Sequence, residues 1–337
     1  MPLVVTGATG FVGKALISDL LSKTVEVKAL LRQSSAAFPL SIKQLVVGDL
    51  ADLDLDDSSV SLRDVFCGVE VVVHAAARVH VMSDDASNPL TEFRKVNRDA
   101  TLILARLAAE SGVKRFVFLS SIKVNGEMTR LGHPFTPDDA YVPDDPYGLS
   151  KYEAEQGLFA LAQETGMEVV IIRPPLVYGP GVKANFASMI KWMGKPVPLP
   201  FGSIHNQRSL VALDNLVSFI SLCADREKSP QAANQVFLIS DGEDVSTTQL
   251  LRKVGQSLHL QSPSGIKAWL VPVPVSIMTL FAKLLGKGDV ANRLFGSLQV
   301  DSSKARDLLG WDPVITMDEQ LAKMAKARVR DLKAKIT

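Results

Sequence analysis

TGATGFVG, at residues 6–13, carries the strongest fold signal in this chain of 337 residues. It follows the short apolar run Leu3–Val5 and opens a segment with helical periodicity, Phe11–Ser22. A glycine-rich turn between a strand and a helix lets the backbone approach a pyrophosphate at the helix N-terminus. The spacing is GxxGxxG rather than GxGxxG, and the alternative is an ordinary glycine-rich turn. Strand, turn and helix in register favour a nucleotide-binding loop, with the cofactor contacts Gly7, Gly10, Phe11, Val12 and Gly13.

Short β-branched runs recur along the chain and predict the strands of one sheet. They are Leu3–Val5, Val25–Leu31, Gln44–Val47, Val69–His74, Arg115–Leu119, Val169–Ile172 and Val236–Ile239. Most are separated by segments with helical periodicity, namely Phe11–Ser22, Thr101–Ser111 and Tyr152–Thr165. This alternation predicts an α/β fold with a doubly wound parallel (Rossmann) sheet.

The alternation weakens beyond Tyr178, where proline and glycine become frequent. We expect the chain to return to the sheet at Ser209–Cys223 and Val236–Ile239. Residues 1–180 with 208–242 would then form the NAD(P)-binding domain. Residues 181–207 with 243–337 would form a smaller, discontinuous C-terminal lobe that binds the substrate.

The composition argues against several classes of protein. Lys and Arg number 37 against 36 Asp and Glu, without a basic stripe, so we expect no nucleic-acid partner. Cys67 and Cys223 lie far apart and outside any CxxC motif, which argues against a disulfide framework or a metal site. The apolar stretch Trp269–Leu285 is short and interrupted, so we expect no membrane span. Since the chain passes from Met1 directly into a strand, we expect no signal peptide and a cytoplasmic protein.

From the glycine motif onward the sequence resembles the extended short-chain dehydrogenase/reductases. The resemblance implies that Asp49 and Leu50 clamp the adenine. It implies that small side chains let the cofactor lie against the backbone at Ala75, Ala76 and Ala77. It also implies a structural and proton-relay role for Asn97. Arg32 ends the second strand where an acidic residue would bind the ribose of NAD. An arginine there suits the 2′-phosphate of NADP, and the alternative is a solvated surface arginine.

The predicted catalytic group is Ser121 with Tyr147 and Lys151, in SSIKVNG at 120–126 and YGLSK at 147–151. Tyr147 and Lys151 are four residues apart and therefore share a helical face. A free tyrosine has a pKa of about 10, and an adjacent ammonium and a cationic nicotinamide would lower it. Tyr147 would exchange the proton, Lys151 would bind the nicotinamide ribose, and Ser121 would hold the sugar oxygen. A surface helix pair is the alternative explanation of the spacing.

Over almost its whole length the chain resembles the NAD-dependent epimerase/dehydratase family of nucleotide-sugar enzymes. RPPLVYGPG at residues 173–181 is similar to a motif of that family, which implies that Pro174 lies near the nicotinamide. The resemblance also implies that Asn185, Arg208 and Arg293 bind the diphosphate of a UDP-linked sugar. LGWDP at 309–313 resembles a structural signature of the family. The implied cofactor is NADP(H) or NAD(H).

Departures from the family pattern bear on the reaction. Lys123-Val124 stand where 4,6-dehydratases carry an Asp-Glu pair, and Asn125 stands where galactose epimerases usually carry Tyr. SSIKVNGE and AARVHVM look most like enzymes that form UDP-N-acetylquinovosamine for bacterial surface polysaccharides such as O-antigen. We therefore expect an NAD(P)H-dependent 4-ketoreductase of a UDP-4-keto-6-deoxy-hexosamine. The alternative is a UDP-hexose or UDP-N-acetylhexosamine 4-epimerase with retained NAD, and a remote one is a non-catalytic cofactor-sensing regulator.

The helical segments Thr101–Ser111 and Tyr152–Thr165 are apolar on more than one face. Such a surplus apolar stripe suits a two-fold four-helix contact, which predicts a homodimer.

Overall fold

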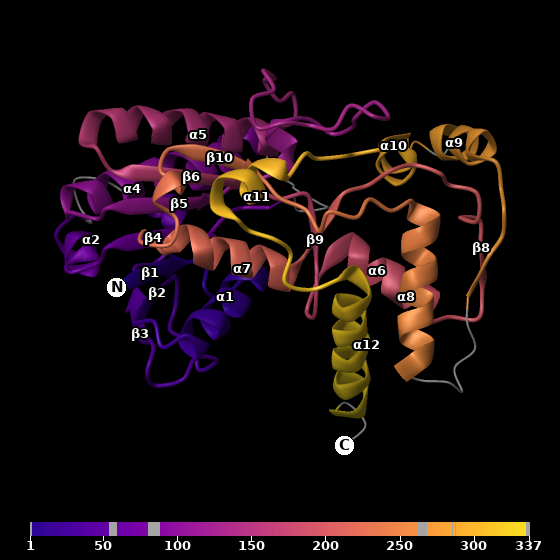
Figure 1. Ribbon diagram of the computed structural model, residues 1–337, viewed down its shortest axis with the longest axis horizontal. Helices are drawn as coiled ribbons and strands as arrows, with labels where there is room; N and C mark the ends of the chain where they lie inside the picture. The colour runs from indigo at the N-terminus through magenta and orange to yellow at the C-terminus, as the bar shows by residue number, and fades with distance from the viewer. Residues whose placement is uncertain are drawn as a thin grey trace.

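The computed structural model describes residues 2–53, 59–79, 88–261, 268–284, 286 and 288–334. Its centre is a seven-stranded sheet with the strand order β10-β6-β5-β4-β1-β2-β3 (Figure 1). The strands are β1 (Leu3–Thr6), β2 (Val27–Leu31), β3 (Lys43–Val46), β4 (Val71–His74), β5 (Arg115–Leu119), β6 (Glu168–Arg173) and β10 (Gln235–Leu238). Every neighbouring pair is parallel, so the predicted doubly wound α/β fold is confirmed.

Helices and short helical turns connect the strands. The helices are α1 (Phe11–Ser22), α2 (Ser59–Phe66), α3 (Pro89–Arg94), α4 (Ala100–Glu110), α5 (Pro146–Thr165), α6 (Ala184–Met193), α7 (Leu213–Ala224), α8 (Thr247–Gln261), α9 (Val275–Leu284), α10 (Gly288–Phe295), α11 (Ser303–Leu309) and α12 (Met317–Ala334). The turns are η1 (Leu50–Asp52), η2 (Lys95–Asp99), η3 (Ile122–Val124) and η4 (Pro230–Ala232). Helix α1 has the predicted bounds.

Helix α5 begins before the segment that its periodicity indicates. It starts at Pro146 rather than Tyr152, because the Asp145 carboxylate accepts a hydrogen bond from the Gly148 N–H and Pro146 occupies the first helical position. It ends at Gly166, whose φ of +74° is left-handed. Tyr147 consequently lies in the first turn of this helix.

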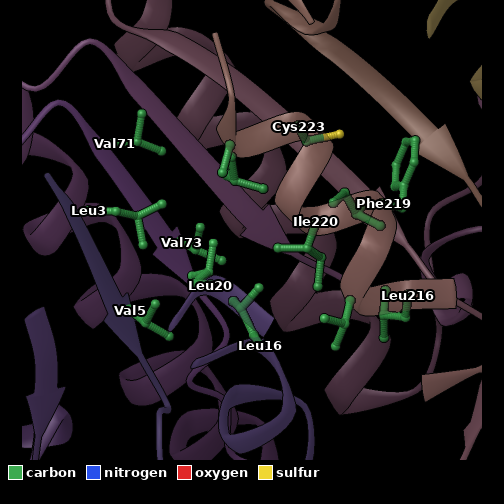
Figure 2. Packing of buried hydrophobic residues seen from close by; sticks show 14 of the residues in the cluster. Leu3, Val5, Leu16, Leu20, Val71, Val73, Leu216, Phe219, Ile220 and Cys223 are labelled. Atoms are coloured by element: carbon green, nitrogen blue, oxygen red, sulfur yellow. The ribbon is translucent and has the colours of Figure 1, made fainter. Parts of the chain in front are cut away.

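The sheet is buried on both faces, because alternate side chains of each strand join different cores. Leu3 and Val5 pack with α1 and α7 on one face, whereas Val4 packs with α2, α4 and α5 on the other. Figure 2 shows the first of these cores, in which Leu16 of α1 and Ile220 of α7 converge on the strands. Burial on both faces explains why these strands are continuous apolar runs.

A smaller lobe packs around a third apolar core, formed mainly by α6, α8 and α12. In it β7 (Leu176–Tyr178) pairs with β9 (Leu210–Ala212), and β8 (Pro198–Leu199) pairs with β11 (Trp269–Leu270). The expected return of Ser209–Cys223 to the main sheet is therefore wrong for its strand: β9 pairs with β7, and only the following helix α7 covers the sheet (Figure 1).

The C-terminal segment contributes to both lobes. Met317 and Leu321 pack in the core of the smaller lobe, whereas Ala305 and Trp311 pack in the core beneath the sheet. The domain boundaries predicted from the sequence stay a prediction. Within the described part of the chain, no helix is long and apolar enough to span a bilayer.

Candidate active site

The predicted site residues gather at the edge where the parallel strands end at their carboxyl termini. They follow β1 (Gly7), β2 (Arg32), β4 (Ala75), β5 (Ser121) and β6 (Pro174). Strands β1 and β4 are neighbours in the sheet but not in the chain, so the crossovers diverge between them. Open α/β sheets bind ligands at such a switch point.

The glycine loop is too tight for any side chain at its first position. Gly7 has a left-handed φ of +66°, and a Cβ atom there would lie 2.6 Å from the backbone of Ala75. A Cβ atom at Gly13 would collide with the carbonyl oxygen of Gly7. Helix α1 begins at Gly10 without a side-chain cap. Its first amides and its dipole therefore suit an anion, and this loop fits the pyrophosphate of a dinucleotide.

Ser121, Tyr147 and Lys151 come together between the end of β5 and the first turns of α5. Tyr147 lies beside Ser121, whose hydroxyl acts to lower the Tyr147 pKa, and the Tyr147 ring packs edge-on against Phe93 with centroids 5.9 Å apart. Lys151 is buried, and its Nζ donates to the Leu119 carbonyl oxygen over 2.9 Å. The structure thus places the three residues in one region, and their role as a catalytic triad stays a prediction.

Taken together, the protein's own groups raise the pKa of Tyr147 rather than lower it. Burial raises the pKa of Tyr147 to about 12; the hydrogen bond with Ser121 lowers it, and the charge of Asp145 raises it further. Burial also lowers the pKa of Lys151 to about 7, although Glu155 opposes this shift. The Lys151 ammonium lies 4.4 Å from the centre of the Phe118 ring and bonds to Leu119. Additional positive charge, such as that of an oxidised nicotinamide, is therefore needed to favour the phenolate.

Asn97 ties the neighbouring helical segments to α5. It is buried in η2, a turn of π-helix between α3 and α4. Its Nδ2 donates to the Arg78 carbonyl oxygen over 3.0 Å and to Ser150 Oγ over 3.1 Å, and its Oδ1 accepts from the Arg78 N–H over 2.9 Å. These bonds support the structural part of the role implied by the family resemblance.

A buried histidine lies beneath the glycine loop. His74 Nδ1 is 2.8 Å from Thr6 Oγ1, and its Nε2 is 3.0 Å from Thr101 Oγ1. Thr6 Oγ1 also accepts the Ala76 N–H over 3.2 Å. Burial, and next the positive charge of Lys151, lower the pKa of His74 to about 3. The imidazole is therefore neutral at physiological pH and links β1, β4 and α4.

The residues predicted to contact the adenosine half of the cofactor line the same edge. Asp49 accepts the Ala51 N–H over 3.0 Å and so caps η1, which contains Leu50. Arg32 projects into solvent beyond β2, and the half-buried run Ala75, Ala76 and Ala77 follows β4. Their positions suit an extended dinucleotide, and each individual contact stays a prediction.

The structure describes some of the predicted substrate residues more fully than others. Arg208 is half-buried, its backbone pairs with Val245, and its Nη1 donates to the Gly296 carbonyl oxygen over 3.0 Å. Burial lowers the pKa of the Arg208 guanidinium. Asn185 lies in α6 and Arg293 in α10, but their side chains are outside the described residues. Pro174 is buried, and its carbonyl oxygen accepts the Ile122 N–H over 3.0 Å.

The sequence analysis missed a buried polar cluster of Ser120, Glu155 and Arg173 beside the triad. Glu155 lies four residues after Lys151, and Arg173 is the first residue of the RPPLVYGPG motif. These two positions could have predicted the cluster from the sequence. A charged side chain inside an otherwise apolar strand or helix face needs a partner when it is buried. No group of three His, Cys, Asp or Glu side chains within the described ranges is arranged to hold a metal ion.

Comparison with known proteins agrees with this geometry. A model of the NAD dependent epimerase/dehydratase family matches residues 3–239. A UDP-glucose 4-epimerase of Vibrio cholerae is 47% identical over 327 residues, which cover 96% of this chain and 94% of that protein.

Solved structures share the fold at low identity. The UDP-glucose 4-epimerase of Thermotoga maritima, solved with UDP-glucose, superposes with a TM-score of 0.75 at 23% identity, covering 98% of this chain and 100% of that one. A short-chain dehydrogenase/reductase of Agrobacterium tumefaciens with bound NAD gives a TM-score of 0.73 at 21% identity, covering 99% of each chain.

Proposed function

Since the chain belongs to the NAD dependent epimerase/dehydratase family of extended short-chain dehydrogenase/reductases, we propose that it is a 4-epimerase of a UDP-linked hexose or N-acetylhexosamine. The observation that carries the proposal is the 47% identity to a UDP-glucose 4-epimerase over 96% of the chain. The grouping of Ser121, Tyr147 and Lys151 at the carboxyl-terminal edge of the sheet supports it, because epimerisation needs a positioned acid–base group beside the cofactor.

The family depends on NAD, which supplies a nicotinamide that takes up and returns the hydrogen of the sugar carbon. The loop of Gly7, Gly10 and Gly13 would hold its pyrophosphate. Lys151 would bind the nicotinamide ribose. Tyr147 would take the proton of the sugar C4 hydroxyl. It would return that proton to the oxygen after the sugar ring has rotated to present its opposite face. Ser121 would hold that oxygen in line with Tyr147.

The sequence by itself favoured a net 4-ketoreductase over a 4-epimerase. The proposal made here reverses that preference. Two sequence features favour the reductase: Asn125 in place of the Tyr of galactose epimerases, and Arg32, which suggests a cofactor that exchanges between turnovers, as a net reductase needs. Asn125, which stands where galactose epimerases usually carry Tyr, is buried and bonded to Arg173 and to the Thr136 carbonyl oxygen. Its place in this cluster gives it a structural role under either reaction. Arg32 still favours an exchangeable NADP, so the 4-ketoreductase of a UDP-4-keto-6-deoxy-hexosamine remains the second candidate.

The deciding experiment measures cofactor retention and product together. The purified protein is denatured and the released NAD is quantified, while the intact protein is incubated with UDP-glucose or UDP-N-acetylglucosamine without added cofactor. An epimerase retains close to one NAD per chain and converts either C4 epimer to a mixture of both. Tyr147→Phe is the control, since it should retain the cofactor and form no epimer.

The opposite pattern would establish the second candidate. A protein that arrives without NAD, leaves UDP-glucose and UDP-N-acetylglucosamine unchanged, and consumes one NAD(P)H for each molecule of a UDP-4-keto-6-deoxy-hexosamine is a reductase.

A homodimer joined through α4 and α5 is proposed as well. Leu102, Ile103 and Phe159 are only partly buried on these two helices, which leaves apolar surface for a four-helix contact. Sedimentation at micromolar concentration should give twice the mass of the 36.4 kDa chain. The mass of a single chain would contradict the dimer.

A further inference from the structure

Two buried charges beside the triad have no part in the chemistry above. Glu155 on α5 is fully buried, and Arg173 at the end of β6 is nearly so. Burying an ion pair is costly, and it is not a general source of stability. A pair kept at this depth beside a proposed acid–base group therefore suggests an electrostatic role.

The carboxylate of Glu155 is held in one position by several donors. Ser120 Oγ donates to its Oε1 over 2.5 Å. Arg173 Nε donates to Oε1 over 3.0 Å, and Arg173 Nη2 donates to Oε2 over 2.5 Å. Arg173 Nη1 donates in turn to Asn125 Oδ1 over 3.0 Å. Ser120, directly after β5, and Arg173, at the end of β6, thus fix this one charge, and Asn125 in turn holds Arg173.

The fixed carboxylate faces the region of the Lys151 ammonium. Lys151 and Glu155 are four residues apart on α5 and so share a face. Lys151 Nζ bonds to the carbonyl oxygen of Leu119, and the carboxylate bonds to the side chain of the next residue, Ser120. The ammonium and the carboxylate therefore meet the end of β5 at adjacent positions.

Within the described ranges, Glu155 is the charged group that acts on Lys151, and the other groups considered near it supply no negative charge. His74 on β4 is neutral, Arg173 on β6 is cationic, and Tyr147 on α5 is a phenol until it loses its proton. The Phe118 ring and the Leu119 carbonyl on β5 offer only dipoles and π-electrons. Burial favours the neutral amine of Lys151, and Glu155 opposes this.

We propose that Glu155 is a positioning residue whose carboxylate, fixed by Arg173 and Ser120, keeps Lys151 in its ammonium form beside Tyr147. The idea deepens the proposed function and rests on the triad being its acid–base group. With Lys151 and Arg173 cationic and Glu155 anionic, the cluster carries one net positive charge. When Tyr147 loses its proton it adds one negative charge, so the cluster and the Tyr147 phenolate together are neutral. Without Glu155, two cations would remain buried, and Lys151 would release its proton before Arg173 does.

Lysine NMR tests this without relying on any substrate. Protein labelled with ¹³C at lysine Cε is titrated with pH, and the resonance lost in Lys151→Met identifies Lys151. The parent should titrate at about pH 7, well below the other lysines. In Glu155→Gln the midpoint should fall by about one pH unit or more. The matched control is Glu164→Gln, which removes an exposed ion pair with Arg106 from the same helix and should leave the midpoint unchanged.

Two results would overturn the proposal. One is a folded Glu155→Gln protein whose Lys151 midpoint matches that of the parent, which would leave Glu155 with a purely structural role. The other is a parent midpoint below about pH 6, which needs no variant and applies even where Glu155→Gln does not fold. The kinetics should change to match. In a plot of rate against pH, the loss of activity of Glu155→Gln at alkaline pH should begin at a lower pH than in the parent, and activity should recover as the pH is lowered. If the protein epimerises no sugar, the NMR titration still tests the role of Glu155. Failure of the proposed 4-epimerase activity and failure of the proposed role of Glu155 can therefore be told apart.

Discussion

The Nη1 atom of Arg32 lies 3.4 Å from the Oδ2 atom of Asp49 at the rim of the candidate site. The sequence assigned these residues separately, Arg32 to a ribose phosphate and Asp49 to the adenine. The parallel pairing of β2 with β3 brings the two loops together. Both side chains are well exposed, so the ion pair itself adds little stability, about 0–1 kcal/mol. If Arg32 binds a 2′-phosphate as predicted, Asp49 would compete with that phosphate for the same guanidinium.

Arg32→Ala should weaken binding of NADPH and leave NADH nearly unaffected, because only NADPH carries the 2′-phosphate. One charged contact of about 1.5–3 kcal/mol corresponds to roughly a tenfold to hundredfold change in affinity. Competition between the two cofactors for the protein measures it. The matched variant Asp49→Asn removes the competing carboxylate and should strengthen NADPH binding. Equal losses for both cofactors in Arg32→Ala would make Arg32 an adenine-stacking residue.

Tyr147→Phe should retain cofactor binding while turnover falls by at least about a hundredfold, the usual contribution of a general acid–base group. The substitution removes the hydroxyl beside Ser121 and leaves the ring packed against Phe93. Steady-state rates, together with the amount of bound NAD, measure the two effects. Activity within tenfold of the parent would show that another group transfers the proton.

Arg208→Ala should weaken binding of the UDP-sugar by about 1.5–3 kcal/mol, the range for a charge-assisted hydrogen bond. Cofactor binding should be unchanged. Because Arg208 also donates to the Gly296 carbonyl oxygen, the unfolding free energy must be measured beside the two affinities. Parallel losses of both ligands and of stability would assign Arg208 to the junction of the lobes rather than to the diphosphate.

The unfolding free energy should fall by roughly 2 kcal/mol between about pH 7.5 and pH 5 through His74 alone. The pKa of His74 is about 3 in the folded protein, against 6.5 for a solvated histidine, so the unfolded chain binds a proton that folded His74 does not. The contribution of His74 is thus complete above about pH 6.5 and is lost as the pH falls.

Urea unfolding at several pH values checks this prediction. His74→Gln should flatten the slope in that window, whereas His205→Gln, at an exposed histidine, should keep the slope of the parent. Equal slopes in the parent and in His74→Gln would mean that His74 binds its proton over the same pH range in the folded and the unfolded protein.

The main sheet and the position of its ligand edge could be predicted from local patterns. Runs such as Leu3–Val5 must lie inside a sheet because their side chains are apolar on both faces, and helical segments between the runs impose parallel pairing. The glycine loop could be placed because Gly7 needs a left-handed backbone and close contact with Ala75. Pairing of β9 with β7 could not be predicted, because three apolar residues fit either sheet equally well.

The charge state of the candidate site follows from contacts that no local pattern contains. The spacing of Tyr147 and Lys151 depends only on the helical repeat, so the sequence alone could pair them. The partners of Glu155 come from β5 and β6, 35 and 18 residues away along the chain. Protonation of a buried group depends on its solvation and on the sign of its neighbours, and both are set only when distant segments pack together. The residue types came from the sequence, whereas the long-range packing set which of them carry charge.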